Sequence, residues 1–421
     1  MDNQSINKNH IKTYKLLICV SLIMYICFIS VKNVFSAEIA LIMKIFNIDK
    51  PTASMTTTYY FFTYGITQIV LFFILGKMNL KKYLTITLLI SAVLMISVGF
   101  CNGITQIYVI YALSGFVQAG LWAGIIAVLS MYLPKKMLAS ANRVLSLGMP
   151  IAGGISYGVS AIFNAFNNWN LPFIILGALS LVSVCVFCFL LKRVDKIPRF
   201  FEEETDNSAT KRDVEYKLVD LSSAWKKVCF YVTFLILSFL STALYYAVLN
   251  WIPSLMVDVF SLSESVSTLI TTIVPLSMMI GAVVFINFCE KYKNVMMLGV
   301  VFFAISLIIL LFLVFFYNFN MIVSLVAIIL FLNIVHGARS LFYSVLPLKM
   351  RNQLNSGALA AIANAFASLG ASVAPTVIGA VIESSGWAIS YLAVFVVEAV
   401  MILIMIALGI AIGKNLKKQI V

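Results

Sequence analysis

Charged residues are scarce in this sequence. They make up 11% of the 421 positions, whereas hydrophobic residues make up 62%. Soluble globular proteins carry about a quarter charged residues, so the composition excludes a water-soluble fold and indicates a lipid environment. Histidine is nearly absent, with only His10 and His336. No nucleophile and base pair can be assembled from so few groups, and we expect a protein that is not an enzyme.

Cysteine is also sparse, and its seven residues lack the spacing of metal ligands or of paired disulfides. All of them fall within or at the edge of apolar runs. We therefore expect small side chains in the protein core, no metal site and no cofactor.

Long apolar runs recur along the whole chain. A helix needs roughly 20 mostly apolar residues to cross a bilayer. Twelve runs of this kind are present, at residues 14–38, 54–76, 83–101, 105–132, 144–163, 170–191, 228–255, 265–288, 294–317, 320–346, 355–381 and 386–412. The first run is longer than the core of a signal peptide and no small-residue cleavage site follows it, so we expect it to remain as the first membrane helix. The sequence predicts an all-α membrane protein with twelve transmembrane helices.

Basic residues are distributed unevenly between the two sides of the predicted spans. Of the 29 Lys and Arg residues, 25 fall on the side that carries both termini, whereas the opposite loops hold Lys44 and Lys50. Cytoplasmic loops carry such an excess. We expect a multi-pass protein of the cytoplasmic membrane with both termini inside. The bias also explains the net charge of +13 without a nucleic-acid partner.

One long polar segment divides the chain. Residues 192–227 contain nine basic and eight acidic side chains and lie between the sixth and seventh spans. They predict a cytoplasmic linker between an N-terminal six-helix bundle, residues 1–191, and a C-terminal six-helix bundle, residues 228–421. The short basic loop after the second span has a counterpart after the eighth, which indicates that the two halves are weak repeats.

Polar residues recur at helical spacing inside several spans. A side chain that faces lipid must be apolar, so such residues indicate a face turned to a cavity or to another helix. Interhelical hydrogen bonding is the alternative role for each of them. Our candidate substrate-binding residues of this kind are Tyr60, Tyr64, Gln68, Gln118, Trp122, Tyr245, Asn250, Trp251, His336 and Asn364.

Two basic residues, Lys32 and Arg339, lie within predicted spans. A charge at the bilayer centre costs at least about 3 kcal/mol, so each must either extend to the membrane surface or serve a polar site. In the second case the site is electropositive and favours an anion. Among the carboxylates, only Glu398 lies in the middle of a predicted span. His336 and Glu398 are the candidates for carrying a coupling proton, although each could equally be a hydrogen-bonded core group.

Short motifs resemble one branch of the major facilitator superfamily, the organophosphate:phosphate antiporters and the related anion:cation symporters. Span 7 carries Trp251-Ile-Pro253-Ser-Leu255, similar to their Trp-x-Pro-x-Leu signature. Span 4 runs Gly115-Phe-Val-Gln118-Ala-Gly120-Leu-Trp122, which resembles Gly-x-x-Gln-Gly-x-Gly-Trp. Span 2 carries Tyr64-Gly65-Ile-Thr-Gln68, similar to Tyr-Gly-x-x-Lys, and Lys32-Asn33 in span 1 resembles part of Arg-Lys-Asn.

The sequence departs from this branch at its two phosphate-binding arginines, which fall on Val31 and Tyr245. Losing both removes the bidentate geometry that suits a phosphate dianion. The sequence therefore favours a monoanionic carboxylate or a neutral polyol-like solute over a sugar phosphate as the substrate.

The resemblance implies the major facilitator fold, two six-helix bundles that alternate access to a midplane site lined by helices 1, 4, 7 and 10. It implies secondary transport of a small organic anion, such as a sugar acid, carboxylate or organophosphate. Such a protein is an antiporter that uses a counter-anion or a symporter that uses a coupling ion, and we expect a monomer.

A proton-coupled exporter of drug-like or amphipathic compounds is the alternative. Its support is Pro150-Ile-Ala-Gly153-Gly154 in span 5, which is similar to part of an antiporter motif. Spans 1, 4, 7 and 10 lack a midplane carboxylate for a cationic substrate, which favours the anion carrier.

Overall fold

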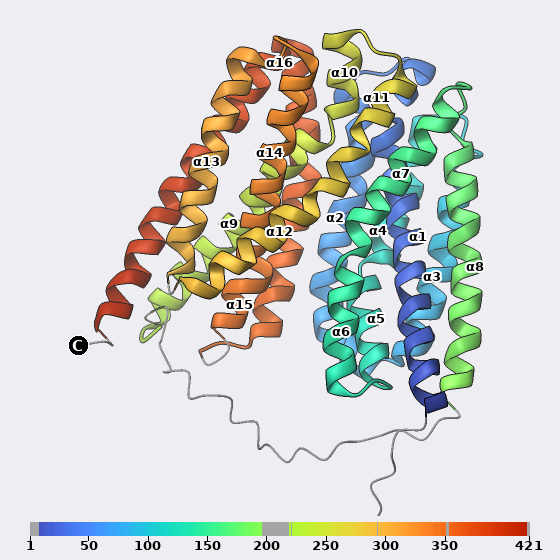
Figure 1. Ribbon diagram of the computed structural model, residues 1–421, viewed down its shortest axis with the longest axis vertical. Coiled ribbons are helices and arrows are strands. Elements are labelled where there is room, and N and C mark those ends of the chain that lie inside the picture. Colours follow the sequence, from blue (N-terminus) through green and yellow to red (C-terminus); the bar gives the residue numbers. More distant parts are fainter. Residues whose placement is uncertain (1–7, 196–218, 220, 293, 351–352, 419–421) are drawn as a thin grey trace, which may run out of the picture.

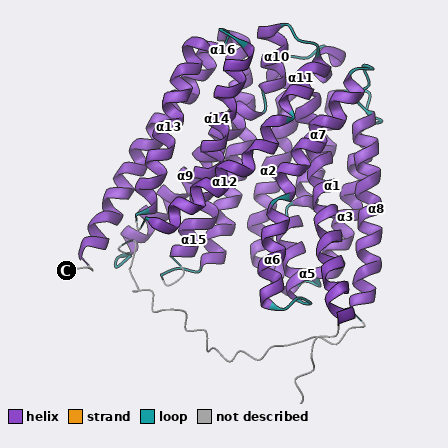
Figure 2. Cartoon of the chain, in the orientation of Figure 1, coloured by secondary structure: helices purple, strands orange, loops and turns teal. Residues whose placement is uncertain are grey.

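The computed structural model describes residues 8–195, 219, 221–292, 294–350 and 353–418, and these residues form helices and loops without any strand (Figure 2). Much of the predicted linker, 196–218 and 220, lies outside the described residues. The prediction of an all-α membrane protein is confirmed.

Eight α-helices and one short 3-10 helix make up the first half of the chain. They are α1 (Lys8–Phe46), α2 (Lys50–Ile74), η1 (Leu75–Lys77), α3 (Leu80–Val98), α4 (Ile104–Gln118), α5 (Leu121–Ser130), α6 (Lys135–Ser146), α7 (Gly148–Asn164) and α8 (Leu171–Val194). The second half contains α9 (Ala224–Leu249), α10 (Ile252–Phe260), α11 (Glu264–Thr271), α12 (Ile273–Lys291), α13 (Val295–Phe316), α14 (Met321–Ser340), η2 (Leu341–Val345), α15 (Leu346–Lys349) and α16 (Ser356–Lys418).

Eleven helices of the described residues are long and apolar enough to cross a membrane. The last of them, Ser356–Asn415, is 60 residues long and contains a break at Gly386, where φ is 82° and ψ is 177°. Only glycine adopts this backbone conformation readily. The chain reverses there, and α16 rises to one end of the molecule and returns toward the other (Figure 1). Helix α16 thus supplies two spans, as the twelve-helix prediction requires.

Polar residues at the helix starts account for several of the boundaries. The side chains of Asn79, Ser223, Ser263, Asn294 and Asn320 each accept a hydrogen bond from a backbone N–H in the first turn of the helix that follows. The first N–H groups of a helix lack intrahelical partners, and such N-caps satisfy them.

The two halves stand side by side, with α1–α8 in one and α9, α13, α14 and α16 in the other (Figure 1). Helix α12 runs obliquely between them. The halves touch where α2 packs along α16 and where α7 packs against α11 and α12. The start of α1, the end of α8, the start of α9 and the end of α16 lie at the same end, here called the terminus end.

At the opposite end of the molecule, hydrogen bonds join the two halves. Thr268 Oγ1 of α11 donates to the Ala37 carbonyl of α1 at 3.1 Å, and Asn164 Nδ2 of α7 donates to Thr268 Oγ1 at 3.2 Å. Ser265 Oγ donates to the Ala161 carbonyl at 2.7 Å. We call this junction of α1 and α7 with α11, formed by Ala37, Ala161, Asn164, Ser265 and Thr268, the gate.

Ion pairs reinforce the same end. Lys44 Nζ lies 2.7 Å from Glu264 Oε1, and Lys50 Nζ lies 3.1 Å from Asp258 Oδ2 and 3.5 Å from Glu383 Oε2. Each pair joins a residue of the first half to one of the second.

Glycines permit close approach of helices within and between the halves. A Cβ built at Gly281 of α12 would lie 2.0 Å from the Asn333 carbonyl oxygen of α14, and one at Gly153 of α7 would lie 2.5 Å from Pro275 Cβ of α12. Small residues of this kind are the usual means by which membrane helices pack tightly.

The cysteines correct one expectation. Only Cys289 is buried, whereas Cys19, Cys185 and Cys229 are exposed. In a membrane protein an exposed apolar face meets lipid, and a thiol is apolar enough to lie there.

Candidate functional site

Two adjoining cavities lie between the halves. The smaller, about 190 Å³, is bordered by α1, α2, α4, α5, α7, α9, α14, η2 and α16, and we call it the inner cavity. The structure brings seven of the predicted site residues to its wall: Lys32, Tyr60, Tyr64, Gln118, Trp122, Arg339 and Asn364.

The larger cavity, about 620 Å³, lies between α1, α6, α7, α9, α12 and α14, and we call it the outer cavity. It extends to Arg143 and Asn287, near the terminus end. Three predicted residues line it: Tyr245, Asn250 and His336. Met149 and Tyr246 line both cavities, so the two spaces are neighbours.

The two basic residues of the inner cavity contact aromatic rings. Lys32 Nζ lies 5.1 Å from the Phe61 ring centroid and 5.6 Å from that of Tyr60. Arg339 Cζ lies 3.9 Å from the Tyr245 ring centroid. Cation–π contacts offset only part of the free energy that burying such a charge costs.

Neither cation has a carboxylate partner among the described residues, where the four ion pairs all involve other lysines. Arg339 is 6% exposed, and its Nε lacks a hydrogen-bond partner. A buried charge without a partner is costly. The inner cavity is therefore an electropositive space that an anion would neutralise.

Amide and hydroxyl groups beside the cations are fixed by hydrogen bonds. Tyr60 Oη donates to Gln118 Oε1 at 2.8 Å, and Gln118 Nε2 donates to Ser91 Oγ at 2.7 Å. Asn364 Nδ2 donates to Gln68 Oε1 at 3.0 Å across the two halves. These bonds orient the polar wall of the inner cavity, and they explain the position of Gln68, which lies behind Asn364.

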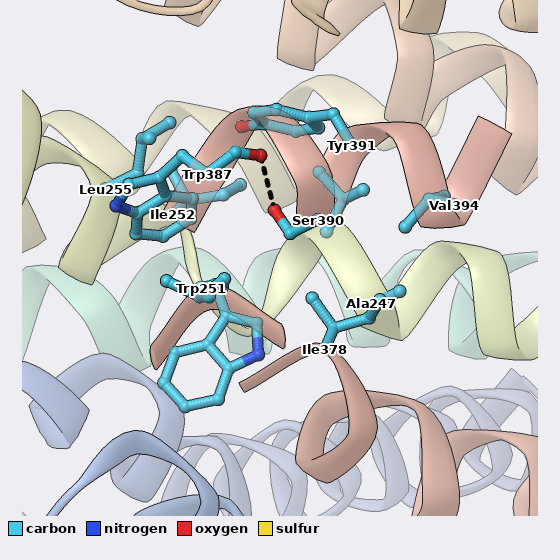
Figure 3. A pocket seen from close by; sticks show the side chains of 11 residues that line it. Ala247, Trp251, Ile252, Leu255, Ile378, Trp387, Ser390, Tyr391 and Val394 are labelled. Atoms are coloured by element: carbon cyan, nitrogen blue, oxygen red, sulfur yellow. Dashed lines mark hydrogen bonds between the residues drawn. The ribbon is translucent and has the colours of Figure 1, made fainter. Parts of the chain in front are cut away.

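Trp251 lies apart from both cavities. Its side chain is 1% exposed, and its Nε1 donates to the Pro375 carbonyl at 3.0 Å. It borders a small cleft with Ile252, Leu255 and Trp387 (Figure 3). Trp251 thus packs α10 against the first part of α16.

The two predicted proton carriers have different surroundings. His336 lines the outer cavity, its ring centroid lies 5.6 Å from that of Tyr245, and its Nδ1 has no hydrogen-bond partner. Glu398 is fully buried in the second part of α16, where Ser306 Oγ lies 2.5 Å from its Oε1. It borders neither cavity.

A second buried carboxyl group lies in the first membrane span. Glu38 is fully buried in α1, which continues to Phe46 rather than ending near residue 38 as predicted. Glu38 thus lies inside the first span and not at its end, where the predicted run 14–38 placed it. The signal was present in the apolar run Ile39-Ala-Leu-Ile42-Met43, which extends the first span beyond the acidic residue.

The wall of the inner cavity also includes side chains outside the predicted set. Phe61, Tyr246 and Tyr343 contribute aromatic surface, and Thr242 and Ser368 contribute hydroxyl groups. In the sequence, residue type alone does not distinguish Phe61 from phenylalanines that face lipid.

A comparison with protein families identifies the family of this chain. The family described as Major Facilitator Superfamily matches residues 20–358. An uncharacterized transporter of Buchnera aphidicola subsp. Schizaphis graminum (strain Sg) is 28% identical over 120 residues, which cover 27% of this chain. The aligned region spans 28% of that relative's length.

Solved structures of similar fold cover nearly the whole chain. A bacterial homolog of the human lysosomal transporter Spinster, in an inward-facing and occupied conformation, has a TM-score of 0.71 and 14% identity over 96% of this chain and 97% of its own. A D-xylose-proton symporter has a TM-score of 0.71 and 13% identity over 93% and 97%. The nucleoside transporter NupG has a TM-score of 0.65 and 15% identity over 94% and 98%. At such identities the likeness concerns the fold alone.

Proposed function

The chain belongs to the Major Facilitator Superfamily, and on that premise we propose that it is a secondary transporter of a small organic anion. The observation that carries this proposal is the pair of cations in the inner cavity, Lys32 and Arg339, which have no carboxylate partner among the described residues. A transported anion supplies the missing charge each time the site is filled.

The size and wall of the inner cavity favour a small, polar solute. Its volume of about 190 Å³ is below the 300 Å³ or more of sites for drug-sized ligands. Gln118 and Asn364 offer amide groups, and Tyr64 adds a phenol to the same wall. A short carboxylate or a sugar acid matches these dimensions.

The resemblance to the organophosphate:phosphate antiporters is weakened by the residue at position 245. Tyr245 stands where that branch has an arginine, and its ring supports the guanidinium of Arg339 instead. With one guanidinium and one ammonium, the site lacks the two-arginine clamp with which that branch holds a phosphate dianion in bidentate geometry. We therefore favour a sugar acid or a carboxylate over an organophosphate.

Alternating access is the mechanism that we propose. Residues 1–191 and 228–421 act as two bundles joined by the linker 192–227, and they rock about the inner cavity. The outer cavity leads from the terminus end, while the gate closes the other end. We place the terminus end in the cytoplasm, because of the excess of basic residues there, and expect the protein to act as a monomer in the cytoplasmic membrane.

A thermal-shift screen of the purified protein in detergent tests the anion proposal. The ligands are sugar acids, small carboxylates, sugar phosphates and cationic dyes. A ligand that binds the folded state raises its melting temperature, by the equivalent of about 2.7 kcal/mol at 100 times Kd. We expect stabilisation by carboxylates or sugar acids.

Charge-neutral variants make the test specific. Lys32→Gln and Arg339→Gln should each weaken anion binding by about 2 kcal/mol or more, roughly 30-fold. Lys192→Gln is the matched control, since Lys192 is exposed at the end of α8 and should bind as the parent does. Stabilisation by cationic dyes alone, unchanged in both variants, would refute the proposal.

A proton-coupled exporter of amphipathic compounds is the second candidate. The apolar wall of the outer cavity favours it, with Met149, Met278, Met279, Leu249 and Pro275. However, Gly153 of the exporter-like motif packs directly against Pro275, which supports a packing role for that motif. The same screen separates the candidates through the class of ligand that stabilises the protein.

A further inference from the structure

Glu38 is fully buried in α1. Its side chain is 0% exposed, and among the described residues neither Oε1 nor Oε2 makes a hydrogen bond of ordinary length and angle, although the side chains of Ser160 and Asn164 lie beside them. An ionised carboxylate in such surroundings is destabilised, because it has lost its water shell and gained no well-formed hydrogen bond in return. Burial therefore favours the neutral, protonated form of the carboxyl group.

Glu38 lies directly at the gate. The preceding residue, Ala37, accepts a hydrogen bond from Thr268 of α11, and Thr268 accepts one from Asn164 of α7. Ser160 and Asn164 of α7 are the polar side chains beside Glu38. Ser160 Oγ and Asn164 Oδ1 are also buried without partners. The gate therefore encloses a set of polar atoms whose hydrogen bonds are incomplete while it is closed.

Among the residues that the structure describes, no ion pair involves Glu38. Helices α5 and α7, which pack against α1, contain no charged residue, and the charges of α3, α6 and α8 lie near the terminus end. Within α1, Lys32 and Lys44 are each six residues away, about 9 Å along the helix. The other titratable groups near this end include Asp49 between α1 and α2, Tyr108 of α4, Tyr157 of α7 and the ion pairs Lys44–Glu264, Lys50–Asp258 and Lys50–Glu383.

We propose that Glu38 is a proton-binding site that couples protonation to the gate. The protonated form permits α7 and α11 to close over it. When the gate opens, water reaches the carboxyl group and accepts its proton, leaving a carboxylate and a hydronium ion. The ionised form holds the gate open, since closing it would again bury an unpaired charge. This inference rests on the alternating access proposed above, but not on the substrate being an anion.

A row of polar residues on α7 connects this site with the outer cavity. Tyr157 lines that cavity, and Ser160 and Asn164 follow it at intervals of three and four residues on the same helix. Residues at this spacing share one helix face. Ser36 on α1 lines the cavity as well, two residues before Glu38. When water enters the outer cavity, the proton of Glu38 can thus pass along these side chains to the terminus end. The carboxyl group of Glu38 can then exchange protons with both ends of the molecule.

Distances across the gate test the proposal without any substrate. Spin labels are placed at Phe166→Cys and Val266→Cys, which are exposed beside α7 and on α11. The seven native cysteines are replaced by alanine or serine. The full chain is reconstituted in lipid nanodiscs, and distance distributions are recorded by double electron–electron resonance from acidic to alkaline pH. We expect the parent to lose its short-distance population as the pH rises.

Two glutamine variants separate this site from other carboxylates. E38Q keeps the shape of the side chain but stays neutral, so it should retain the short distance at every pH. E290Q is the control, an exposed carboxylate near the end of α12 and away from the gate, and should follow the parent. A parent without a pH response, or an E38Q gate that opens with pH as the parent does, would overturn the proposal.

Infrared spectroscopy supplies a second measurement. The carbonyl stretch of protonated carboxyl groups should lose one component in E38Q, and its persistence would count against the assignment. The anion-transport proposal and the Glu38 proposal can be refuted independently of each other. An anion screen without any hit would refute the anion carrier, whereas a gate locked by E38Q would still support the proton site.

Discussion

Adding one methyl group at Gly281 should destabilise the protein and weaken its site. A Cβ there would lie 2.0 Å from the Asn333 carbonyl oxygen, whereas real Cβ atoms essentially never come within 3.0 Å of another heavy atom. Helices α12 and α14 must therefore separate by about 1 Å. Overpacking of this kind costs about 1–3 kcal/mol, and the crossing also carries the hydrogen bond from Asn333 Nδ2 to Ser277 Oγ at 2.8 Å.

The displacement should reach the inner cavity because α14 also positions Arg339. Gly281→Ala should lower the melting temperature in detergent and, in the same sample, reduce stabilisation by the anion identified in the screen. Gly158→Ala is the control, since a Cβ at Gly158 meets nothing within 4 Å. In a helix that substitution should stabilise by about 0.5–1 kcal/mol. Equal melting temperatures for Gly281→Ala and the parent would refute the inferred backbone contact.

Two further substitutions test the closed end and the aromatic cleft. Lys50→Met removes the pairs with Asp258 and Glu383, which should shift the gate toward the open state by about 1 kcal/mol, roughly fivefold in population. The same spin-label pair measures this change, and an unaltered distance distribution would contradict it. Trp251→Phe deletes the bond to the Pro375 carbonyl and should cost about 1–3 kcal/mol of stability, seen as a lower melting temperature. Anion affinity should be unchanged, and a large loss would instead support contact between Trp251 and the solute.

Much of the fold follows from residue types because lipid imposes a simple rule. Every span must be apolar and helical, so the runs that contain Lys32 and Arg339 were recognisable as membrane helices despite their charges. Chain reversal at Gly386 was likewise consistent with the predicted ends of the last two spans, at residues 381 and 386. Periodic polarity also identified residues such as Gln118 and Asn364, which do meet at one cavity.

Other aspects of the site depend on how the helices pack, which the sequence does not specify. Trp251 and Gln68 share helix faces with cavity residues, yet each is turned to a neighbouring helix by one hydrogen bond. Glu38 was assigned to the end of its span because helix ends in membranes vary by several residues. Its burial arises only where α1 meets α7 and α11, which are distant in sequence.

The break at Gly386 also bears on how the protein is made. Helix α16 reverses within a single residue, so its two spans have almost no polar loop between them to draw across the bilayer during synthesis. We therefore expect the two spans to insert together, as a hairpin. A bulkier residue at position 386 would disfavour that turn, and the defect would appear in newly made chains as failed insertion of the last span, before any transport could be assayed.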